Sequence, residues 1–271
     1  MKKKILIAID DGHGKETAGK RSPAFSDGKI LKENDFNERT AEFLQEALQR
    51  NGFDTLMVAP EDTDTPLKTR VQRANDARAD VYISIHANAH GTEWNGANGI
   101  ETWVYEKVGC GEAVGGNAVS STGDSETYRL AKCVHYGLIL ETGRKSRGIK
   151  RSGDLYVLNA TRMHAVLVEC GFMTNREEAE LLCTEDYCRE CGEAICKGIC
   201  EFYKTEYREE EKKMPEEKRY QTMEELPSWA RPLIEEMDIY DCIADTEHLD
   251  MSWDMLRCMV LLDRLWTKKQ G

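Results

Sequence analysis

The spacing of apolar and polar residues divides most of the chain into alternating strand-like and helix-like segments. Short apolar runs rich in β-branched residues predict strands, whereas apolar positions that recur every three or four residues predict amphipathic helices. In the segment Asn34–Asn51, for example, Leu44 and Leu48 lie one turn apart on an apolar face. The predicted strands are Lys4–Ile9, Phe53–Val58, Val81–Ile85, Gly99–Tyr105, Leu155–Leu158 and Ala165–Val168. The other predicted helices are Leu67–Arg78, Ser125–Glu141 and Arg176–Lys204, and the last of these segments forms one or two helices.

This order of elements predicts an α/β fold over residues 1–205. Strands that alternate with helices of about 10–18 residues need crossover connections, which place helices on both faces of a mostly parallel central sheet. The segment Gly91–Ser125 interrupts the pattern because it is rich in Gly, Asn, Ser and Thr around a single predicted strand. Irregular segments of this length tend to serve function.

The pattern changes after Tyr203. Residues 206–220 are charged and lack apolar periodicity, so we interpret them as a linker. Residues 221–271 predict a small all-α C-terminal module, with helices at about 226–237 and 249–266. From Thr205 onward the chain has 10 Lys and Arg against 17 Asp and Glu. A helical module of about fifty residues is marginally stable alone, so we expect it to self-associate or to dock elsewhere.

Composition and charge exclude several classes of protein. The 271 residues carry a formal net charge of −12, which disfavours general nucleic-acid binding because that function needs a basic surface. No apolar run approaches the roughly 20 residues that would span a bilayer. The apolar stretch near the N-terminus has five residues, whereas a secretory signal needs about 7–15. We therefore expect synthesis in the cytoplasm without a signal peptide.

Five of the ten cysteines lie between Cys183 and Cys200. Cys188-x-x-Cys191 could form half of a zinc knuckle or a redox pair. Neither a second such motif nor a nearby histidine completes a set of four ligands, and the surrounding pattern is helical. We favour a packing role for these residues and a chain made in a reducing compartment.

Three segments place metal-binding side chains just beyond the ends of predicted elements. His13 lies between two glycines after the first strand, Glu33 opens the first long helix, and His86 ends an apolar strand. In open α/β sheets, ligands bind beyond the carboxyl ends of the strands. Two histidines and one carboxylate, with a fourth position open to water, compose a catalytic zinc site.

Each of these residues also has an ordinary structural interpretation. His13 alone could be a turn residue, and Glu33 alone could be a charge that the helix dipole favours. The glycines around His13 do not form a phosphate-binding loop, because Ile9 and Glu16 occupy the positions of its first Gly and its Ser or Thr. His90 follows His86 by four residues, but the preceding segment is strand-like, so we interpret His90 as a loop residue.

Glu169 is the candidate catalytic residue. An apolar predicted strand delivers it to the same edge of the sheet as the two histidines. It could be an ion-paired carboxylate at that edge, or a general base that takes a proton from a zinc-activated water and returns it to a leaving amine. His164 could orient a ligand or steady the oxyanion, although a histidine of the core or surface is favoured there.

The chain resembles the zinc-dependent N-acetylmuramoyl-L-alanine amidases of the amidase-3 type over residues 4–203. The similarity lies in Asp11-Gly-His-Gly14, Glu33 with Asn37, Arg73-Ala-Asn75, Ser84-Ile-His-Ala-Asn88, Gly99-Ile-Glu-Thr102 and Val168-Glu-Cys-Gly-Phe-Met-Thr-Asn175. The resemblance implies that His13, Glu33 and His86 bind Zn²⁺ and that Glu169 is the catalytic carboxylate. It also implies a peptidoglycan substrate, cut between N-acetylmuramic acid and L-alanine.

Two positions depart from the family pattern. Asp11 stands where the family usually has proline, and Lys15 follows the first motif where Gly or Gly-Asp is common. Neither change removes a zinc ligand, so we expect an active enzyme.

The simplest setting is a phage or prophage endolysin that reaches the wall after release, with a bacterial autolysin as the alternative. An inactive wall-binding protein and a zinc peptidase are the competing functions. The C-terminal helices could bind the wall or form a homo-oligomer.

Overall fold

The computed structural model describes residues 4–61, 63–106, 125–210, 219–226, 228, 230–232, 234–235, 251–252, 255 and 259. Two compact units divide the chain, Met1–Glu210 and Glu211–Gly271. No helix among the described residues is long and apolar enough to cross a membrane.

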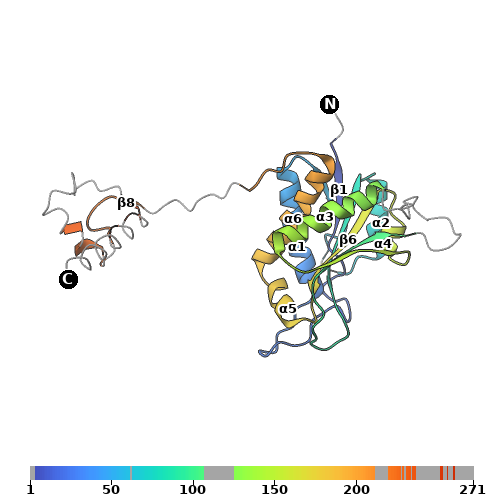
Figure 1. The fold of residues 1–271 in the computed structure, drawn as a ribbon, viewed down its shortest axis with the longest axis horizontal. Helices are drawn as coiled ribbons and strands as arrows, with labels where there is room; N and C mark the ends of the chain where they lie inside the picture. The colour runs from blue at the N-terminus through green and yellow to red at the C-terminus, as the bar shows by residue number, and fades with distance from the viewer. Residues whose placement is uncertain are drawn as a thin grey trace. The chain divides into compact units, whose positions relative to one another are not determined.

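A six-stranded sheet forms the centre of the first unit (Figure 1). Its strands lie in the order β2-β1-β3-β6-β4-β5, and the first four of these are parallel to one another. Strand β4 runs antiparallel to β6, and β5 is parallel to β4. The strands are β1 (Leu6–Asp10), β2 (Asp54–Met57), β3 (Val81–Asn88), β4 (Ile100–Tyr105), β5 (Ser146–Ser152) and β6 (His164–Phe172).

Helices cover both faces of this sheet, which confirms the predicted α/β class. Three long helices pack together on one face, and two shorter ones lie on the other (Figure 1). The first group is α1 (Glu33–Arg50), α3 (Glu126–Thr142) and α6 (Glu185–Tyr203), and the second is α2 (Leu67–Asp76) and α4 (Tyr156–Asn159), while α5 (Arg176–Leu182) follows β6. Buried aliphatic side chains of β1, β3 and β6 form the core between these layers.

The structure differs from the prediction at two elements of the first unit. Leu155–Leu158 was expected to be a strand, but Tyr156–Asn159 is a single helical turn. Strand β5 was not predicted, because Ser146–Ser152 contains three basic residues and only one aliphatic residue. As the last strand of the sheet, β5 needs little apolar character. Residues 107–124 of the Gly-rich segment lie outside the described residues.

Four of the five clustered cysteines lie in the core, as the packing interpretation predicted, whereas the fifth, Cys183, is exposed. Cys188, Cys191, Cys196 and Cys200 are buried among aliphatic and aromatic side chains, and none of them forms a disulfide. Gly192 and Gly198 allow α6 to approach its neighbours, since a Cβ atom on Gly192 would lie 2.8 Å from the backbone nitrogen of Leu44. Small side chains on α6 therefore fit the close packing of the three helices.

The described part of the second unit contains a short ladder in which β7 (Arg219–Tyr220) pairs antiparallel with β8 (Met251–Ser252). Tyr220, Leu226, Ala230, Ile234 and Met251 form a small buried cluster. An entirely helical module was expected here, and the ladder corrects that expectation. Residues 231–232 and 234–235 of the predicted helix at 226–237 are helical, and most of the predicted helix at 249–266 lies outside the described residues.

Candidate metal centre and catalytic residue

The structure brings together the three side chains that the sequence singled out as metal ligands. One ligand atom from each of His13, Glu33 and His86 lies within 4.8 Å of the others. Oε1 of Glu33 is 2.9 Å from Nδ1 of His86 and 3.4 Å from Nε2 of His13. The group lies where β1 and β3 end and α1 begins. It is the only group of three or more such residues in the described part of the chain.

A tight turn presents His13, and several buried side chains hold that turn. His13 has a φ of 65°, in the left-handed region that residues other than Gly seldom occupy. Nδ2 of Asn34 donates to the carbonyl oxygen of Asp11, and Nδ2 of Asn37 donates to that of Gly12. Nη2 of Arg70 donates to the His13 carbonyl at 2.6 Å. These bonds fix a backbone conformation that would otherwise be unfavourable.

His86 is oriented from behind by a chain of two hydrogen bonds. Its Nε2 lies 3.1 Å from the Ser84 hydroxyl, which in turn donates to Oδ2 of Asp10 at 2.6 Å. With Nε2 engaged in this way, Nδ1 is the nitrogen that faces Glu33. Metal-binding histidines commonly donate their other ring N–H to such a partner, which fixes the tautomer and the ring orientation.

Charge at the centre follows from the contact between Glu33 and the two imidazoles. Burial by itself raises the pKa of Glu33, but hydrogen bonds from His13 and His86 outweigh it and hold that pKa far below its usual range. Burial by itself lowers the pKa of His86, whereas the Glu33 carboxylate raises it overall. Glu33 is therefore an anion, as a carboxylate ligand must be.

Glu169 lies beside this centre, across from His86 on the neighbouring strand. Its Oε2 is buried and has no hydrogen-bond partner among the described residues. Burial raises the pKa of Glu169 to about 8, with the His86 charge opposing the shift and Glu33 adding to it. The side chain also lines a cavity of about 320 Å³ between β3, β4, β5 and β6. A carboxyl group in such a position is suited to exchange a proton with a bound molecule.

The donor set and its surroundings fit a divalent metal ion. Two imidazole nitrogens and a carboxylate are typical ligands of zinc, and Glu33 is only 2% exposed. Gly12 keeps the space beside His86 open, since a Cβ atom there would lie 2.4 Å from Cε1 of that ring. The unpartnered oxygen of Glu169 has unused capacity for a hydrogen bond beside the same three residues.

The other histidines that the sequence analysis considered do not join the three ligands. His90 follows β3 in a loop, as interpreted, and lines the Glu169 cavity. His164 begins β6, at the opposite end of that strand from Glu169. Its Nδ1 hydrogen-bonds the Thr127 hydroxyl, and its ring lies against the ring of Phe202. His164 is therefore a structural histidine, as favoured, and the alternative role in stabilising the oxyanion of the reaction is wrong.

Sequence reasoning missed Asp10 and Arg70. Both are almost fully buried, and Nη1 of Arg70 contacts Oδ1 of Asp10 at 2.6 Å. Asp10 ends the first strand, and Arg70 shares the buried face of α2 with Val71 and Ala74. An arginine at an apolar position of an amphipathic helix was the available signal, because such a residue needs an acidic partner inside the fold.

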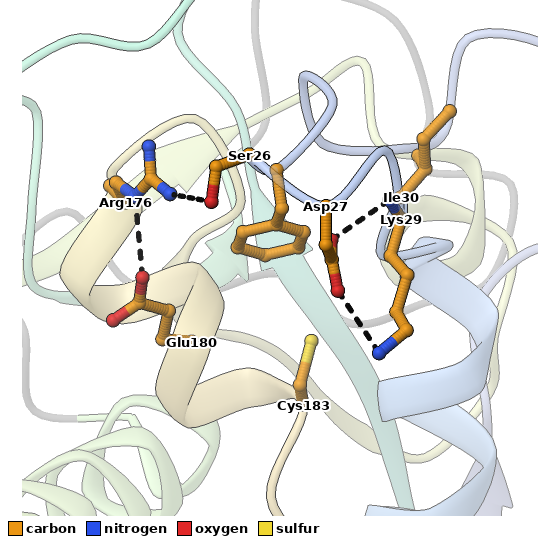
Figure 2. Close-up of a pocket in the computed structure, with 8 residues that line it drawn as sticks. Ser26, Asp27, Lys29, Ile30, Arg176, Glu180 and Cys183 are labelled. Atoms are coloured by element: carbon orange, nitrogen blue, oxygen red, sulfur yellow. Dashed lines mark hydrogen bonds and ion pairs between the residues drawn. The ribbon is translucent and has the colours of Figure 1, made fainter.

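A second cavity, of about 400 Å³, lies between the loop that precedes α1 and helix α5 (Figure 2). In Figure 2, Arg176 reaches both Ser26 and Glu180, and Lys29 pairs with Asp27. The exposed thiol of Cys183 lies at the edge. None of the four predicted site residues lines this cavity.

The fold and the centre together define a class: an α/β protein with a two-histidine, one-carboxylate site at the carboxyl ends of its parallel strands and a buried carboxyl group beside it. Residues 7–201 match the Amidase_3 family, described as N-acetylmuramoyl-L-alanine amidase. The chain belongs to this family.

Individual relatives agree with this assignment. The endolysin of Bacillus phage SPP1 is 33% identical over 202 residues, which are 73% of this chain and 65% of the endolysin. N-acetylmuramoyl-L-alanine amidase LytC of Bacillus subtilis is 30% identical over 198 residues, which are 73% of this chain but 35% of LytC. The catalytic domain of the amidase CwlV from Bacillus (Paenibacillus) polymyxa superposes with a TM-score of 0.61 at 28% identity, covering 74% of this chain and 99% of that domain.

The hydrogen bond behind His86 leads to a prediction about metal affinity. Replacing Ser84 with alanine should weaken zinc binding by about 10- to 100-fold, because Nε2 of His86 loses its partner and the ring its fixed orientation. Competition with a zinc-chelating dye measures this affinity. Ser26→Ala removes a hydroxyl that bonds the exposed Arg176 and should leave the affinity unchanged. Equal affinities for the two variants would contradict the orienting role.

Proposed function

We propose that this chain hydrolyses the amide bond between N-acetylmuramic acid and L-alanine in peptidoglycan. In this proposal, His13, Glu33 and His86 hold a zinc ion, and Glu169 is the catalytic residue. The observation that carries it is the convergence of the three ligand atoms within 4.8 Å of one another, beside a carboxyl group with an unpartnered oxygen. Family membership and the named amidases among the relatives support the substrate.

A bound zinc ion supplies Lewis-acid chemistry at such a site and makes water more acidic. The residues of the chain do the rest of the work. Ser84 and Asp10 hold the His86 ring in place, and the bonds to the His13 turn keep the second imidazole beside Glu33. Both positions are set before substrate arrives, which avoids reorganisation during the reaction.

Glu169 moves the proton in this scheme. Its carboxylate accepts a proton from the attacking water and then gives it to the nitrogen of the departing L-alanine. Burial is the main cause of its raised pKa, so the group is a stronger proton acceptor than an exposed glutamate. A cation bound nearby stabilises the ionised form and brings that pKa down towards the pH of the reaction.

Digestion of purified muropeptides, with and without a chelator, tests the function directly. We expect mass analysis to find peptides that begin with a new L-alanine amine and sugars that end in a lactyl carboxyl group, both lost on chelation and restored by zinc. Cuts within the peptide would instead show a zinc peptidase. Absence of any cleavage would favour an inactive wall-binding protein, an alternative that the complete set of four residues argues against.

The proposed setting is a lytic one, in which the enzyme is made in the cytoplasm and reaches the wall after release. The match to the SPP1 endolysin supports it, although this chain spans only about two thirds of that protein and about one third of LytC. A bacterial autolysin is the alternative setting. Timed release of the chain into the medium during prophage induction, measured by immunoblot, distinguishes the two.

We further propose the division into a catalytic domain of 1–205, a linker of 206–220 whose last two residues form β7, and a C-terminal module of 221–271. The first residues of that linker contact the catalytic unit. The backbone amide of Arg208 donates to Oδ1 of Asn51 at 2.6 Å, and the Tyr207 hydroxyl bonds Glu193, which also pairs with Arg50. A truncation that preserves these contacts should therefore end after Glu210.

Truncation after Glu210 is predicted to leave the rate of amide hydrolysis on soluble muropeptides within about twofold of the full chain, because all four site residues precede it. Binding to intact walls or the oligomeric state should change, since the removed module is expected to provide one or the other. Sedimentation with purified walls and analytical ultracentrifugation measure the two properties. If both stayed the same, neither proposed role of the module would survive.

A further inference from the structure

The cavity beside Glu169 is lined by an arginine that the proposed chemistry does not use. Arg147 of β5, Glu101 of β4 and Glu169 all line this cavity of about 320 Å³. Trp103 and Phe172 add aromatic surface to it. The wall therefore combines charge with apolar area next to the catalytic carboxyl group, as binding sites for small polar ligands commonly do.

Glu101 anchors two cations through a single oxygen. Its Oε1 accepts from Nε of Arg147 at 2.5 Å and from Nζ of Lys150 at 2.6 Å, while the residue itself is only 2% exposed. Burial alone raises the pKa of Glu101, but the two cations outweigh it and lower that pKa overall. Glu101, Arg147 and Lys150 together carry one positive charge, and this charge lies beside the Glu169 carboxyl group opposite Glu101.

Arg147 keeps hydrogen-bonding capacity within this cluster. Its side chain is 32% exposed, and the guanidinium lies 4.8 Å from the centroid of the Phe172 ring, which restricts its orientation. Among the described residues, Nε is used by Glu101, and Nη1 makes a long contact of 3.4 Å to the Asn98 carbonyl. The Nη2 donors are left, and a planar, already oriented guanidinium is well suited to bind a carboxylate.

The sheet register sets the spacing between this cation and the catalytic group. Glu101 lies opposite Glu169 in the antiparallel β4–β6 pair, and Arg147 belongs to the next strand, β5. Adjacent strands are about 4.8 Å apart, so two steps across the sheet cover about 10 Å. An extended peptide advances about 3.5 Å per residue. A carboxylate on the residue after L-alanine, about 7 Å from the bond that is cut, lies within reach of an arginine side chain.

We infer that Arg147 binds the free α-carboxylate of the stem residue that follows L-alanine, and that it makes the enzyme select stems with D-glutamate there over stems with the neutral D-isoglutamine. This inference rests on the proposed amidase function and adds a specificity-determining residue to it. Glu101 positions the guanidinium, and Lys150 pairs with the same carboxylate oxygen, so Glu101 does not neutralise Arg147 alone.

The test compares two uncross-linked glycan substrates whose stems are L-alanyl-D-glutamate or L-alanyl-D-isoglutamine. We expect the full-length, zinc-loaded protein to cleave the first with a kcat/KM about 10- to 100-fold higher, the range of a charge-assisted hydrogen bond of about 1.5–3 kcal/mol. Arg147→Gln should lose this preference, with KM for the carboxylate substrate raised more than KM for the amide substrate. Arg147→Lys should retain part of the preference.

The matched control is Arg151→Gln, on the same strand, because Arg151 pairs with Glu106 and does not line the cavity. It should keep the full preference. Equal cleavage of both substrates by the unmodified protein, or a preference that persists in Arg147→Gln, would overturn the inference while leaving the amidase function intact. Failure to cleave either substrate would instead refute the proposed function. The wild-type comparison needs no variant, so it remains decisive if Arg147→Gln folds poorly.

Discussion

Replacing Glu169 with glutamine is expected to lower kcat for muropeptide hydrolysis by about 10²- to 10⁴-fold, the usual contribution of a general acid–base group. The carboxamide has nearly the same size, but it cannot accept a proton from water. Zinc content should stay at the wild-type level, because Glu169 is not among the three converging ligands. Steady-state kinetics and metal analysis on the same preparation measure both properties. His86→Ala, in contrast, should lose zinc and activity together.

Glu180→Gln is the matched control for this experiment. It makes the same chemical change on an exposed residue of α5 that pairs only with Arg176 among its described contacts. Its kcat and zinc content should equal those of the unmodified protein. An active Glu169→Gln enzyme would refute the assignment of the base, and loss of zinc from it would indicate that Glu169 also binds the metal.

Replacing Arg70 with methionine is expected to reduce the free energy of unfolding of the first unit by about 3–5 kcal/mol, the range for breaking a buried ion pair. Methionine fills much of the same space, but it leaves the buried Asp10 carboxylate without its cationic partner. The carbonyl oxygens of Thr65 and His13 lose a donor as well. The His13 turn should then loosen, so zinc affinity should fall with stability.

Urea unfolding with pulsed thiol labelling measures this loss in the first unit alone. Cys170 and Cys188 are fully buried there, so their labelling reports unfolding of that unit. Arg73→Met is the control, three residues further along α2, because Arg73 pairs with the exposed Glu61 and should cost about 1 kcal/mol or less. Similar losses for both variants would show that the buried position of Arg70 has no special importance.

Much of the fold could be predicted because its central strands are short apolar runs flanked by amphipathic helices. The strands that became β1, β3 and β6 are mostly buried, and β1 and β6 contain runs of four aliphatic residues, while aliphatic residues alternate with other side chains in β3. Their ends carry His13, His86 and Glu169, so the parallel topology alone placed these residues at one edge. Only the metal and the roles of the residues stay predictions.

The supporting contacts could not be predicted, because they depend on three-dimensional distances that no spacing encodes. Ser84 and Asp10 lie on different strands and meet only when β1 and β3 pair in one particular register. Strand β5 was missed for a related reason. It is a basic, mostly polar segment whose strand conformation depends on pairing with β4, and local propensity carries little of that information.

The reversed direction of β4 places the proposed metal ligands and the proposed stem-binding arginine on different strands, so each can vary without the other. Strands β4 and β5 begin at the edge of the sheet where β1, β3 and β6 end. Glu101 and Arg147 therefore lie near the beginnings of their strands, whereas His86 and Glu169 lie near the ends of theirs. If Arg147 selects the stem as inferred, substitutions on β5 change which stems are cleaved and leave the strands that carry the proposed ligands untouched. Related enzymes could adapt to differently modified walls by exchanging residues of one peripheral strand.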